Sequence, residues 1–368
     1  MAINRMHRRT FLQLASVGVT STALLSKIGA ASDVIQPGPQ VMTVLGPIAP
    51  EAMGLTLTHE HLLADLRPQH EKTKNVRPYN QDEVLKVVLP YLNRVRELGC
   101  KTFVDCTAVY LGRDAALLKR ISEESRLQIL TVTGNYAALG LRGLPPYVLT
   151  DTVDALAERW IREWKHGIEG TGVRPGLIKL GFEGGPLTDV EQKLIRAAAI
   201  AHLETGLTIG AHISGPSSFL QGQGIKSWSA ESASGQLAIL EEEGVNPSAW
   251  IWIHAQNEDD LSHQVSAARR GAWISFDNIG NGDTIKQYVH QVVTLRNQGL
   301  LNKILVSQDA GWYWVGEPGG GKFRPYDTLF TAFIPALRES GLTQSEVDTL
   351  LIRNPAHCFP IRVRLKKP

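Results

Sequence analysis

The sequence is poor in cysteine, and it has no hydrophobic run long enough to cross a membrane. Its 368 residues include only 3 cysteines, Cys100, Cys106 and Cys358, an odd number without metal-type spacing. Such a count excludes a disulfide-stabilised scaffold. We expect three small buried side chains, although one disulfide between two of them remains open. The apolar stretches have the length of core strands, so we expect no membrane span in the mature chain.

The sequence also lacks an excess of charge of either sign. The chain has 38 Lys and Arg residues against 36 Asp and Glu. Four of the bases lie within residues 1–31, which hold no acid, so 38 minus 4 leaves 34 bases against 36 acids in the remainder. No block of basic residues occurs, and we therefore expect no nucleic acid as a partner.

Residues 1–31 have the composition of a cleaved export signal. The stretch "RRTFLQLASVGVTSTALLSKIGAAS" begins with Arg8 and Arg9, continues as a mildly apolar run and ends in small residues. Paired arginines in this position are typical of the twin-arginine signal of bacteria. We expect removal of residues 1–31, a single mature domain over 32–368, and export from a bacterial cell to the periplasm. The alternative is a basic amphipathic anchor at the N-terminus.

Short apolar runs alternate with longer segments of helical periodicity throughout the remaining chain. Segments such as "QDEVLKVVLPYLNRVRELG" and "TDVEQKLIRAAAIAHLETG" separate the runs, and several open on a capping residue and close on Gly. This rhythm predicts a (β/α)₈ TIM barrel, with a doubly wound open sheet as the alternative. The eight predicted strands are 55–61, 101–108, 127–136, 176–182, 207–214, 249–256, 272–278 and 303–311.

Polar side chains lie late in these runs, where a barrel places its active site. A buried strand end has little use for such groups unless they are paired or bind something. Residues separated by two positions on a strand share a face, as in the first run. The candidate site residues are His59, His61, Tyr136, Lys179, His212, His254 and Asp309.

The four histidines among these candidates favour a metal site. Imidazole is a common ligand of zinc and related ions, and Asp309 adds a carboxylate. Four imidazoles and one or two carboxylates suffice for two metal ions. The remaining histidines fall in the N-terminal segment or in loop and helical contexts, where a surface or core role is expected.

Lys179 is unusual because it lies among Leu, Ile and Phe in "GLIKLGF". A charged amine there is costly to bury. One interpretation pairs it with a nearby acid such as Glu183. The other is a neutral amine that adds CO₂, giving a carbamate with two oxygens able to bridge two ions. The spacing alone does not decide between them.

The complete set resembles the phosphotriesterase family of the amidohydrolase superfamily. The local matches are "THEHLLADL", "GVRPGLIKLG", "RAAAIAHLETGLTIGAH", "HAQNEDDL", "ILVSQDAG" and "IRNPAHCF", spread over about residues 42–360. The resemblance implies a (β/α)₈ barrel with a binuclear site at the C-terminal ends of the strands. It also implies two divalent ions, most often Zn²⁺, and hydrolysis of an ester, lactone or phosphotriester by a metal-bridging hydroxide. A homodimer is usual in this family.

The resemblance also implies roles for individual residues. His59, His61, Lys179 and Asp309 would hold the more buried ion, and His212 and His254 the second. Lys179 would bridge both ions as a carbamate. Asp309 would accept the proton of the hydroxide.

Three positions bear on the substrate. The best organophosphate hydrolases of the family relay the proton through a histidine after the seventh strand and an aspartate after the sixth. Asn278 and Asn257 stand there instead, which argues against an efficient phosphotriesterase of that kind. Tyr136 matches the aromatic residue of the lactonase branch, which also has an arginine that we do not find here. Tyr136 either orients a substrate carbonyl or packs the barrel rim.

A long segment follows the last strand. Residues 310–327 carry Trp312, Tyr313, Trp314 and Phe323 around three glycines at 319–321. We interpret it as an aromatic wall or lid with a glycine hinge, or else as a loop whose aromatics pack onto helices or a dimer partner. Two other functions remain as alternatives. They are a non-catalytic metal- or ligand-binding barrel and a mononuclear amidohydrolase that cleaves an amide.

Overall fold

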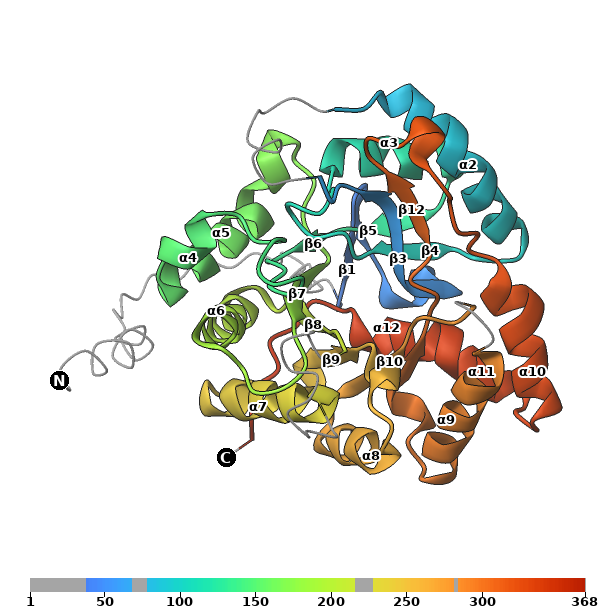
Figure 1. The fold of residues 1–368 in the computed structure, drawn as a ribbon. Helices are drawn as coiled ribbons and strands as arrows, with labels where there is room; N and C mark the ends of the chain where they lie inside the picture. Colours follow the sequence, from blue (N-terminus) through green and yellow to red (C-terminus); the bar gives the residue numbers. More distant parts are fainter. Residues whose placement is uncertain (1–37, 68–77, 216–227, 281–283, 368) are drawn as a thin grey trace, which may run out of the picture. The chain divides into compact units, whose positions relative to one another are not determined.

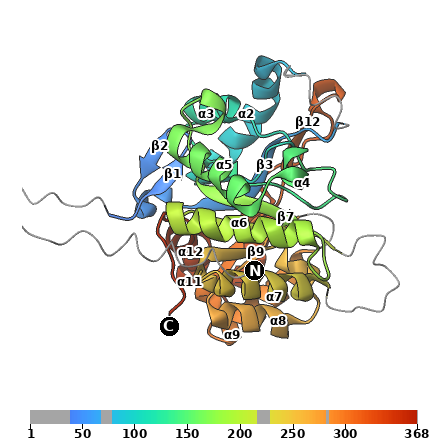
Figure 2. The ribbon, with the colours of Figure 1, turned by 90° about the vertical axis from the view of Figure 1, so that its left-hand side faces the viewer.

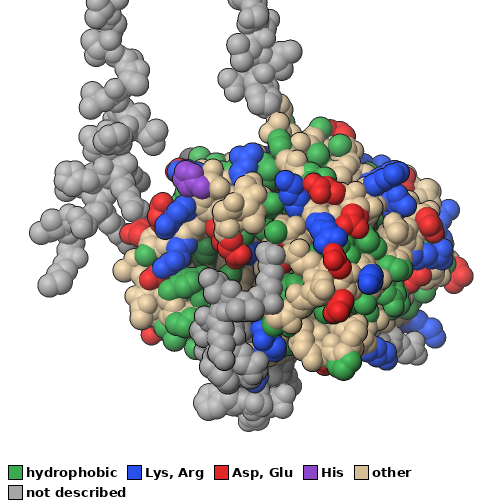
Figure 3. All heavy atoms as spheres, turned by 90° about the horizontal axis from the view of Figure 1, so that it is seen from above, with side chains coloured by type: hydrophobic (Ala, Val, Ile, Leu, Met, Phe, Trp, Pro, Cys, Tyr) green, Lys and Arg blue, Asp and Glu red, His purple; other side chains and the backbone are tan. Residues whose placement is uncertain are grey.

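The computed structural model describes residues 38–67, 78–215, 228–280 and 284–367. The predicted export signal lies outside the described residues and stays a prediction. None of the described helices combines the length and the apolar content needed to cross a membrane. On the described part of the face in Figure 3, basic and acidic side chains are interspersed rather than gathered into a block of one sign.

All eight predicted runs form strands, and the strands follow one another in chain order around a barrel (Figure 1). Two sheets make up its wall, one with the order β6-β7-β8-β9-β10-β11 and one with the order β12-β3-β4-β5, and every pair within them is parallel. The (β/α)₈ prediction is therefore confirmed, because an open doubly wound sheet would reverse its strand order. The strands are β3 (Thr56–Ala64), β4 (Thr102–Asp105), β5 (Gln128–Leu130) with β6 (Val132–Thr133), β7 (Leu177–Phe182), β8 (Thr208–Ile213), β9 (Trp250–Ile253), β10 (Trp273–Phe276), β11 (Ile304–Val306) and β12 (Gly311–Trp314).

The barrel closes where the chain after β11 runs beside β3. The Asp309 backbone N–H donates to the His59 carbonyl at 3.0 Å, and the His61 N–H donates to the Ala310 carbonyl at 2.9 Å. Gly311 is required at this seam. It has φ +101°, and a Cβ there would lie 1.8 Å from the His61 carbonyl oxygen. Closure thus brings the first and last candidate ligands onto neighbouring strands.

Helices surround the strands (Figures 1 and 2) and begin at the capping residues that the sequence offers. Asn80, Asp114, Thr152 and Thr188 each accept a hydrogen bond from the first turn of their helix. The helices are α2 (Gln81–Glu97), α3 (Ala115–Ser125), α4 (Tyr147–Thr150), α5 (Val153–His166), α6 (Asp189–Thr205), α7 (Trp228–Glu242), α8 (Leu261–Arg270), α9 (Ile285–Asn297), α10 (Ile334–Glu339), α11 (Gln344–Asp348) and α12 (Asn354–Cys358). A hairpin of β1 (Val41–Thr43) and β2 (Gly46–Ile48) precedes the barrel.

Side chains on alternate strand positions build two separate cores. Ile178, Leu180 and Phe182 of β7 pack in the cluster shared with the helices, while Leu177 belongs to the smaller cluster that fills the barrel. Lys179 follows Leu177 at the next inward position. The three cysteines are buried and free, which confirms the expectation of small core residues.

Candidate metal centre

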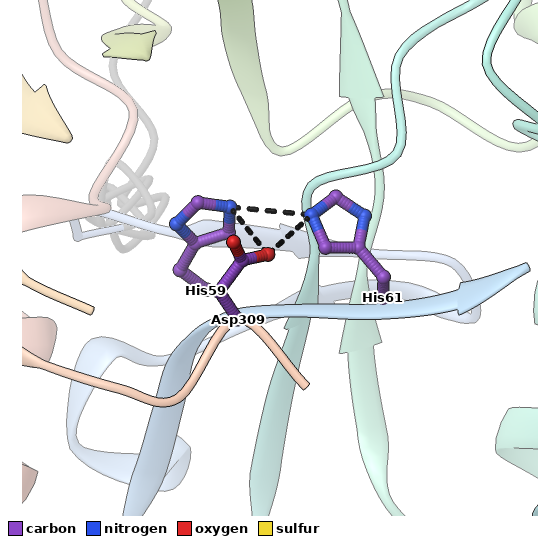
Figure 4. Close-up of side chains that lie close together, drawn as sticks. All are labelled: His59, His61 and Asp309. Carbon is purple, nitrogen blue, oxygen red and sulfur yellow. Dashed lines mark hydrogen bonds and ion pairs between the residues drawn. The ribbon is translucent and has the colours of Figure 1, made fainter. Parts of the chain in front are cut away.

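Five of the predicted ligands meet at the carboxyl ends of the strands. The Nε2 atoms of His59 and His61 are 3.3 Å apart, and Asp309 Oδ1 lies 3.7 Å from the first and 3.1 Å from the second. Figure 4 shows the two imidazoles and the carboxylate pointing toward one another. Lys179 Nζ is 3.2 Å from His59 Nε2, and His254 Nε2 is 3.8 Å from Asp309 Oδ2. The structure therefore brings these residues together from strands far apart in the sequence.

Each of three imidazoles has its Nδ1 atom occupied by an oxygen outside the cluster. His59 Nδ1 lies 3.0 Å from Asp277 Oδ2, and His254 Nδ1 lies 2.6 Å from Asp277 Oδ1. His61 Nδ1 lies 2.8 Å from Thr107 Oγ1, whose own proton goes to the Leu63 carbonyl at 3.3 Å. A carboxylate only accepts hydrogen bonds, so the Nδ1 atoms carry the protons and the Nε2 atoms keep free lone pairs.

Asp277 is the functional residue that the sequence reasoning missed. It follows β10 in "SFDN" and is fully buried. Its oxygens also accept from the Ser275 hydroxyl at 2.7 Å. Burial by itself would raise the pKa of this carboxyl, but His254 and His59 outweigh burial and hold the pKa well below its usual range. Asp277 groups with His59 and His254 as a possible ligand set, but its oxygens are taken up by the Nδ1 protons. We therefore regard it as support for the ligands.

The central atoms of the cluster form a donor set suited to a cation. His61 Nε2 and Asp309 Oδ1 face each other with lone pairs, and Asp309 Oδ1 is buried without a hydrogen-bond partner among the described residues. A tetrahedral ion with bonds of about 2.0–2.2 Å holds its ligand atoms about 3.3–3.6 Å apart. The separations of 3.1, 3.3 and 3.7 Å among His59, His61 and Asp309 are close to that range. These residues thus fit a metal ion.

The surroundings of His59 and His61 favour neutral imidazoles, the form that binds metals. Burial, with the help of Lys179, lowers the pKa of His59 to about 4. Burial also lowers the pKa of His61. Asp309 remains ionised, since burial alone would raise its pKa but the neighbouring histidines lower it to about 2. His59 and His61 therefore present neutral nitrogens, and Asp309 an ionised oxygen, at neutral pH. Burial alone would lower the pKa of His254 as well, but Asp277 outweighs burial and raises it.

Lys179 lies at the bottom of the site with 1% of its surface exposed. Among the described residues, no carboxylate lies within ion-pair distance of its amine. Glu183, the acid proposed as its partner, instead accepts hydrogen bonds from the Ser214 hydroxyl at 2.9 Å and from the Gly140 N–H at 3.0 Å. The pairing with Glu183 is therefore wrong. The carbamate interpretation stays a prediction.

His212 lies beside the cluster and contacts Tyr136. The ring centroids of His212 and His254 are 4.3 Å apart, and His212 Nε2 is 2.7 Å from the Tyr136 hydroxyl. Burial, reinforced by His254 and Lys179, lowers the pKa of His212 well below its usual value. Burial also raises the pKa of Tyr136, so its hydroxyl remains protonated and donates to the imidazole. Gly181 makes room for the phenol, because a Cβ there would lie 2.3 Å from the ring.

Two of the candidate ligands have strained backbones. His254 has φ +62° and Asp309 has φ +50°, in the left-handed region that residues with a Cβ rarely adopt. Each conformation costs on the order of 1–3 kcal/mol, and such residues are concentrated at functional sites. Both follow the end of a strand, so the backbone turn directs the side chain across the barrel mouth.

A cavity of about 160 Å³ opens above the cluster and has an aromatic wall. Trp312 stacks on His61 with ring centroids 3.8 Å apart, and Trp314 stacks on Trp312 at 5.6 Å. Phe323 instead stacks on Tyr91 of α2 at 4.6 Å. Both interpretations of residues 310–327 therefore hold in part. The tryptophans face the cavity, whereas Phe323 packs against a helix. The glycine hinge stays a prediction.

The two asparagines have different surroundings. The Asn257 side chain donates to the Ile213 carbonyl at 3.1 Å. Asn278 Oδ1 is buried and without a hydrogen-bond partner among the described residues. An amide neither takes up nor releases a proton at neutral pH, so neither residue extends a proton path from Asp309.

A (β/α)₈ barrel with histidines and an aspartate converging at the carboxyl ends of its strands has the architecture of a metal-dependent hydrolase. Residues 39–359 match the profile of the phosphotriesterase family. The chain belongs to this family, whose members include hydrolases.

Named relatives cover most of the chain. The "Phosphotriesterase homology protein" of Escherichia coli (strain K12) is 31% identical over 309 residues, which is 83% of this chain and 98% of the relative. The "Aryldialkylphosphatase" of Saccharolobus solfataricus is 28% identical, over 83% of this chain and 95% of the relative. The "N-acetyltaurine hydrolase" of Xenopus tropicalis is 25% identical, over 86% of this chain and 96% of the relative. The names of these relatives thus include both a phosphatase and an N-acetyl hydrolase.

Proposed function

We propose that this protein is a binuclear zinc hydrolase that cleaves an ester or lactone, with phosphotriesters as poorer substrates. The observation that carries the proposal is the convergence of His59 Nε2, His61 Nε2 and Asp309 Oδ1 in a buried site where Lys179 Nζ lies 3.2 Å from His59 Nε2. A barrel that only binds a ligand has no need of a lysine in that position, where burial is costly.

The residues divide into two ligand groups in this proposal. His59, His61 and Asp309 would hold the buried ion, His212 and His254 would hold the second, and Lys179 as a carbamate would serve both. When bound, the ions polarise the carbonyl or phosphoryl oxygen of the substrate and supply hydroxide from water near neutral pH. His212 would bind an ion through Nε2 only after it released the Tyr136 hydroxyl, which lies 2.7 Å from that nitrogen.

Two side chains perform the remaining chemistry. The Asp309 carboxylate is ionised, lies among the ligands and accepts the proton of the attacking water. The Tyr136 hydroxyl, once released from His212, donates to the substrate carbonyl oxygen. For Tyr136, hydrogen bonding to the substrate is favoured over packing of the barrel rim, because its hydroxyl points toward the candidate ligands.

Amide hydrolysis is the second candidate, since relatives named N-acetyltaurine hydrolase align over nearly their whole length. The ester proposal is preferred because the cavity wall near the cluster is mainly apolar. Leu66, Leu111, Leu139, Trp312 and Trp314 line it. An efficient phosphotriesterase is disfavoured by Asn257 and Asn278.

Metal analysis of the purified protein followed by a substrate panel tests the proposal. We expect about two ions per chain, loss of aryl ester and lactone hydrolysis on chelation, and recovery with Zn²⁺ or Co²⁺. One ion per chain, with turnover of N-acyl amides only, would instead support the mononuclear alternative. Metal binding without turnover of any class would support the non-catalytic barrel.

A lysine variant tests the carbamate. Lys179→Ala should lose most of its metal and activity, and short carboxylic acids should restore part of both by taking the place of the carbamate. Lys165→Ala is the matched control, because Lys165 lies on the surface and pairs with Glu204. Full metal content in Lys179→Ala would contradict the bridging role.

A further inference from the structure

A turn of left-handed backbone lies at the rim of the cavity. Leu139, Gly140 and Leu141, in the connection between β6 and α4, have φ values of +67°, +61° and +66°. Glycine adopts this conformation readily, but each leucine pays about 1–2 kcal/mol for it. Two strained leucines in succession require contacts that hold them, and such strain is typical of functional loops.

Hydrogen bonds within the turn, and one to a side chain beyond it, hold this conformation. The Leu141 N–H donates to the Ala137 carbonyl at 3.2 Å, within the turn itself. The Arg142 Nε–H donates to the Leu139 carbonyl at 3.0 Å. The Gly140 N–H donates to Glu183 Oε1 at 3.0 Å. Only the last of these ties the turn to another part of the barrel, and it uses a charged acceptor, which makes it the stronger kind.

Glu183 connects three strand ends. It follows β7 directly, and its second oxygen accepts from the Ser214 hydroxyl at 2.9 Å. Ser214 follows β8, two residues after His212, and its N–H donates to the Phe182 carbonyl at 3.0 Å. The Glu183 side chain therefore links the end of β8 to the turn after β6.

The two leucines of the turn face different surroundings. Leu139 lines the cavity above the cluster, together with Tyr136 and Trp312. Leu141 does not line this cavity. Both leucines do line a separate surface groove beside α6. Each has 39% of its surface exposed. They therefore make a matched pair, alike in residue type, strain and exposure, of which only Leu139 borders the site.

We propose that Glu183 is a positioning residue, which holds the left-handed turn so that Leu139 forms the apolar wall opposite Trp312 and Trp314. The wall binds the apolar group of a substrate and takes no part in the bond cleavage. This inference rests on the proposed ester hydrolysis. Its consequence is a change in KM that depends on the size of the substrate and leaves kcat largely unchanged.

Kinetics with two aryl esters test the wall. For p-nitrophenyl hexanoate, Leu139→Ala and Glu183→Ala should raise KM about tenfold, the effect of losing a side-chain contact of about 1.4 kcal/mol. For p-nitrophenyl acetate, KM should change less than about twofold. Leu141→Ala should leave both substrates unchanged, and Glu183→Gln, which keeps one acceptor oxygen, should recover much of the hexanoate affinity. Equal effects of Leu139→Ala and Leu141→Ala would overturn the proposal.

Amide hydrogen exchange separates this inference from the proposed function. Exchange at Gly140 should be faster in Glu183→Ala than in the wild type, with no change at helices on the far side of the barrel. If the metal-loaded wild type hydrolyses neither ester, the proposed function fails, while the exchange result still decides whether Glu183 holds the turn. Unchanged exchange at Gly140 removes the positioning role, whatever the kinetics show.

Discussion

His59 Nδ1 donates a hydrogen bond to the buried carboxylate of Asp277 at 3.0 Å, across 218 residues of sequence. The same carboxylate accepts from His254, so one side chain on the seventh strand orients imidazoles on the first and the sixth. The Nε2 lone pairs of both rings are thereby directed to the cluster.

Asp277→Asn should weaken metal binding without abolishing it. An amide holds at most one of the two Nδ1 protons and removes the negative charge that supports both rings. We expect a 10–100-fold loss of metal affinity, measured by competition with a chromophoric chelator. Asp259→Asn is the control, because Asp259 follows His254 in the chain but is exposed. Wild-type affinity in Asp277→Asn would show that the ligands need no such support.

Tyr136→Phe separates the effect of the Tyr136 hydroxyl on His212 from its proposed hydrogen bond to the substrate carbonyl. Since the hydroxyl competes for His212 Nε2 at 2.7 Å, its removal should leave the metal content intact or increase it. The loss of a donor to the carbonyl oxygen should lower kcat/KM by about tenfold or more. The two values come from metal analysis and ester kinetics on the same sample. An unchanged kcat/KM would assign Tyr136 to packing of the rim.

Glu60→Gln should destabilise the seam that carries Asp309. The Glu60 carboxylate accepts from the Ser307 hydroxyl at 2.7 Å and from the N–H groups of Gln308 and Ala310 at 3.0 and 2.8 Å. A glutamine turns its NH₂ toward one of these donors, which leaves a buried group unpaired. Burial raises the pKa of Glu60 to about 8, so the effect is measured in urea above pH 8, where the side chain is ionised. We expect the free energy of unfolding to fall there by about 1–3 kcal/mol. A variant as stable as the wild type would mean that the donors find other acceptors.

His202 should make the barrel acid-sensitive. Its Nδ1 faces the Leu207 carbonyl at 2.7 Å, its Nε2 accepts from the Arg364 N–H, and burial lowers its pKa from 6.5 to about 4. Because the folded pKa lies below the unfolded value, the stabilisation is complete above pH 6.5 and is lost as the pH falls toward 4. The loss amounts to about 3 kcal/mol.

Urea unfolding of the wild type and of His202→Gln between pH 7 and 4 measures this contribution. The difference between the two proteins should shrink as the pH falls, because glutamine does not titrate. A constant difference over this range would exclude His202 as the source.

Much of the fold follows from local patterns in the sequence. The eight apolar runs became the eight barrel strands, because burial on both faces imposes the same composition on every strand of a parallel barrel. The helix starts also followed the capping residues. Polar residues at the last inward positions marked the site, since only binding or pairing justifies them there.

The supporting contacts were not predictable in this way. Asp277 was not predicted because its partners, His59 and His254, are distant in sequence. The neighbouring Asn278 was considered instead, since it stands where other family members have a relay histidine. The pairing of Lys179 with Glu183 across the barrel mouth was wrong because Glu183, just beyond the end of β7, turns toward Ser214 and Gly140. The left-handed conformation of Leu139 and Leu141 contradicts their local preference and depends on contacts from another strand end.

The sequence by itself determined the alternation of strands and helices, the inward-facing strand position of Lys179 and the types of ligand side chain available. Those properties depend on neighbours along the chain and on periods of two and 3.6 residues. Only the tertiary structure decided which nitrogen of each histidine is free, because the answer lies with Asp277 and Thr107 on other strands. Closure of the barrel brings those strands together, and with them the lone pairs that define the site.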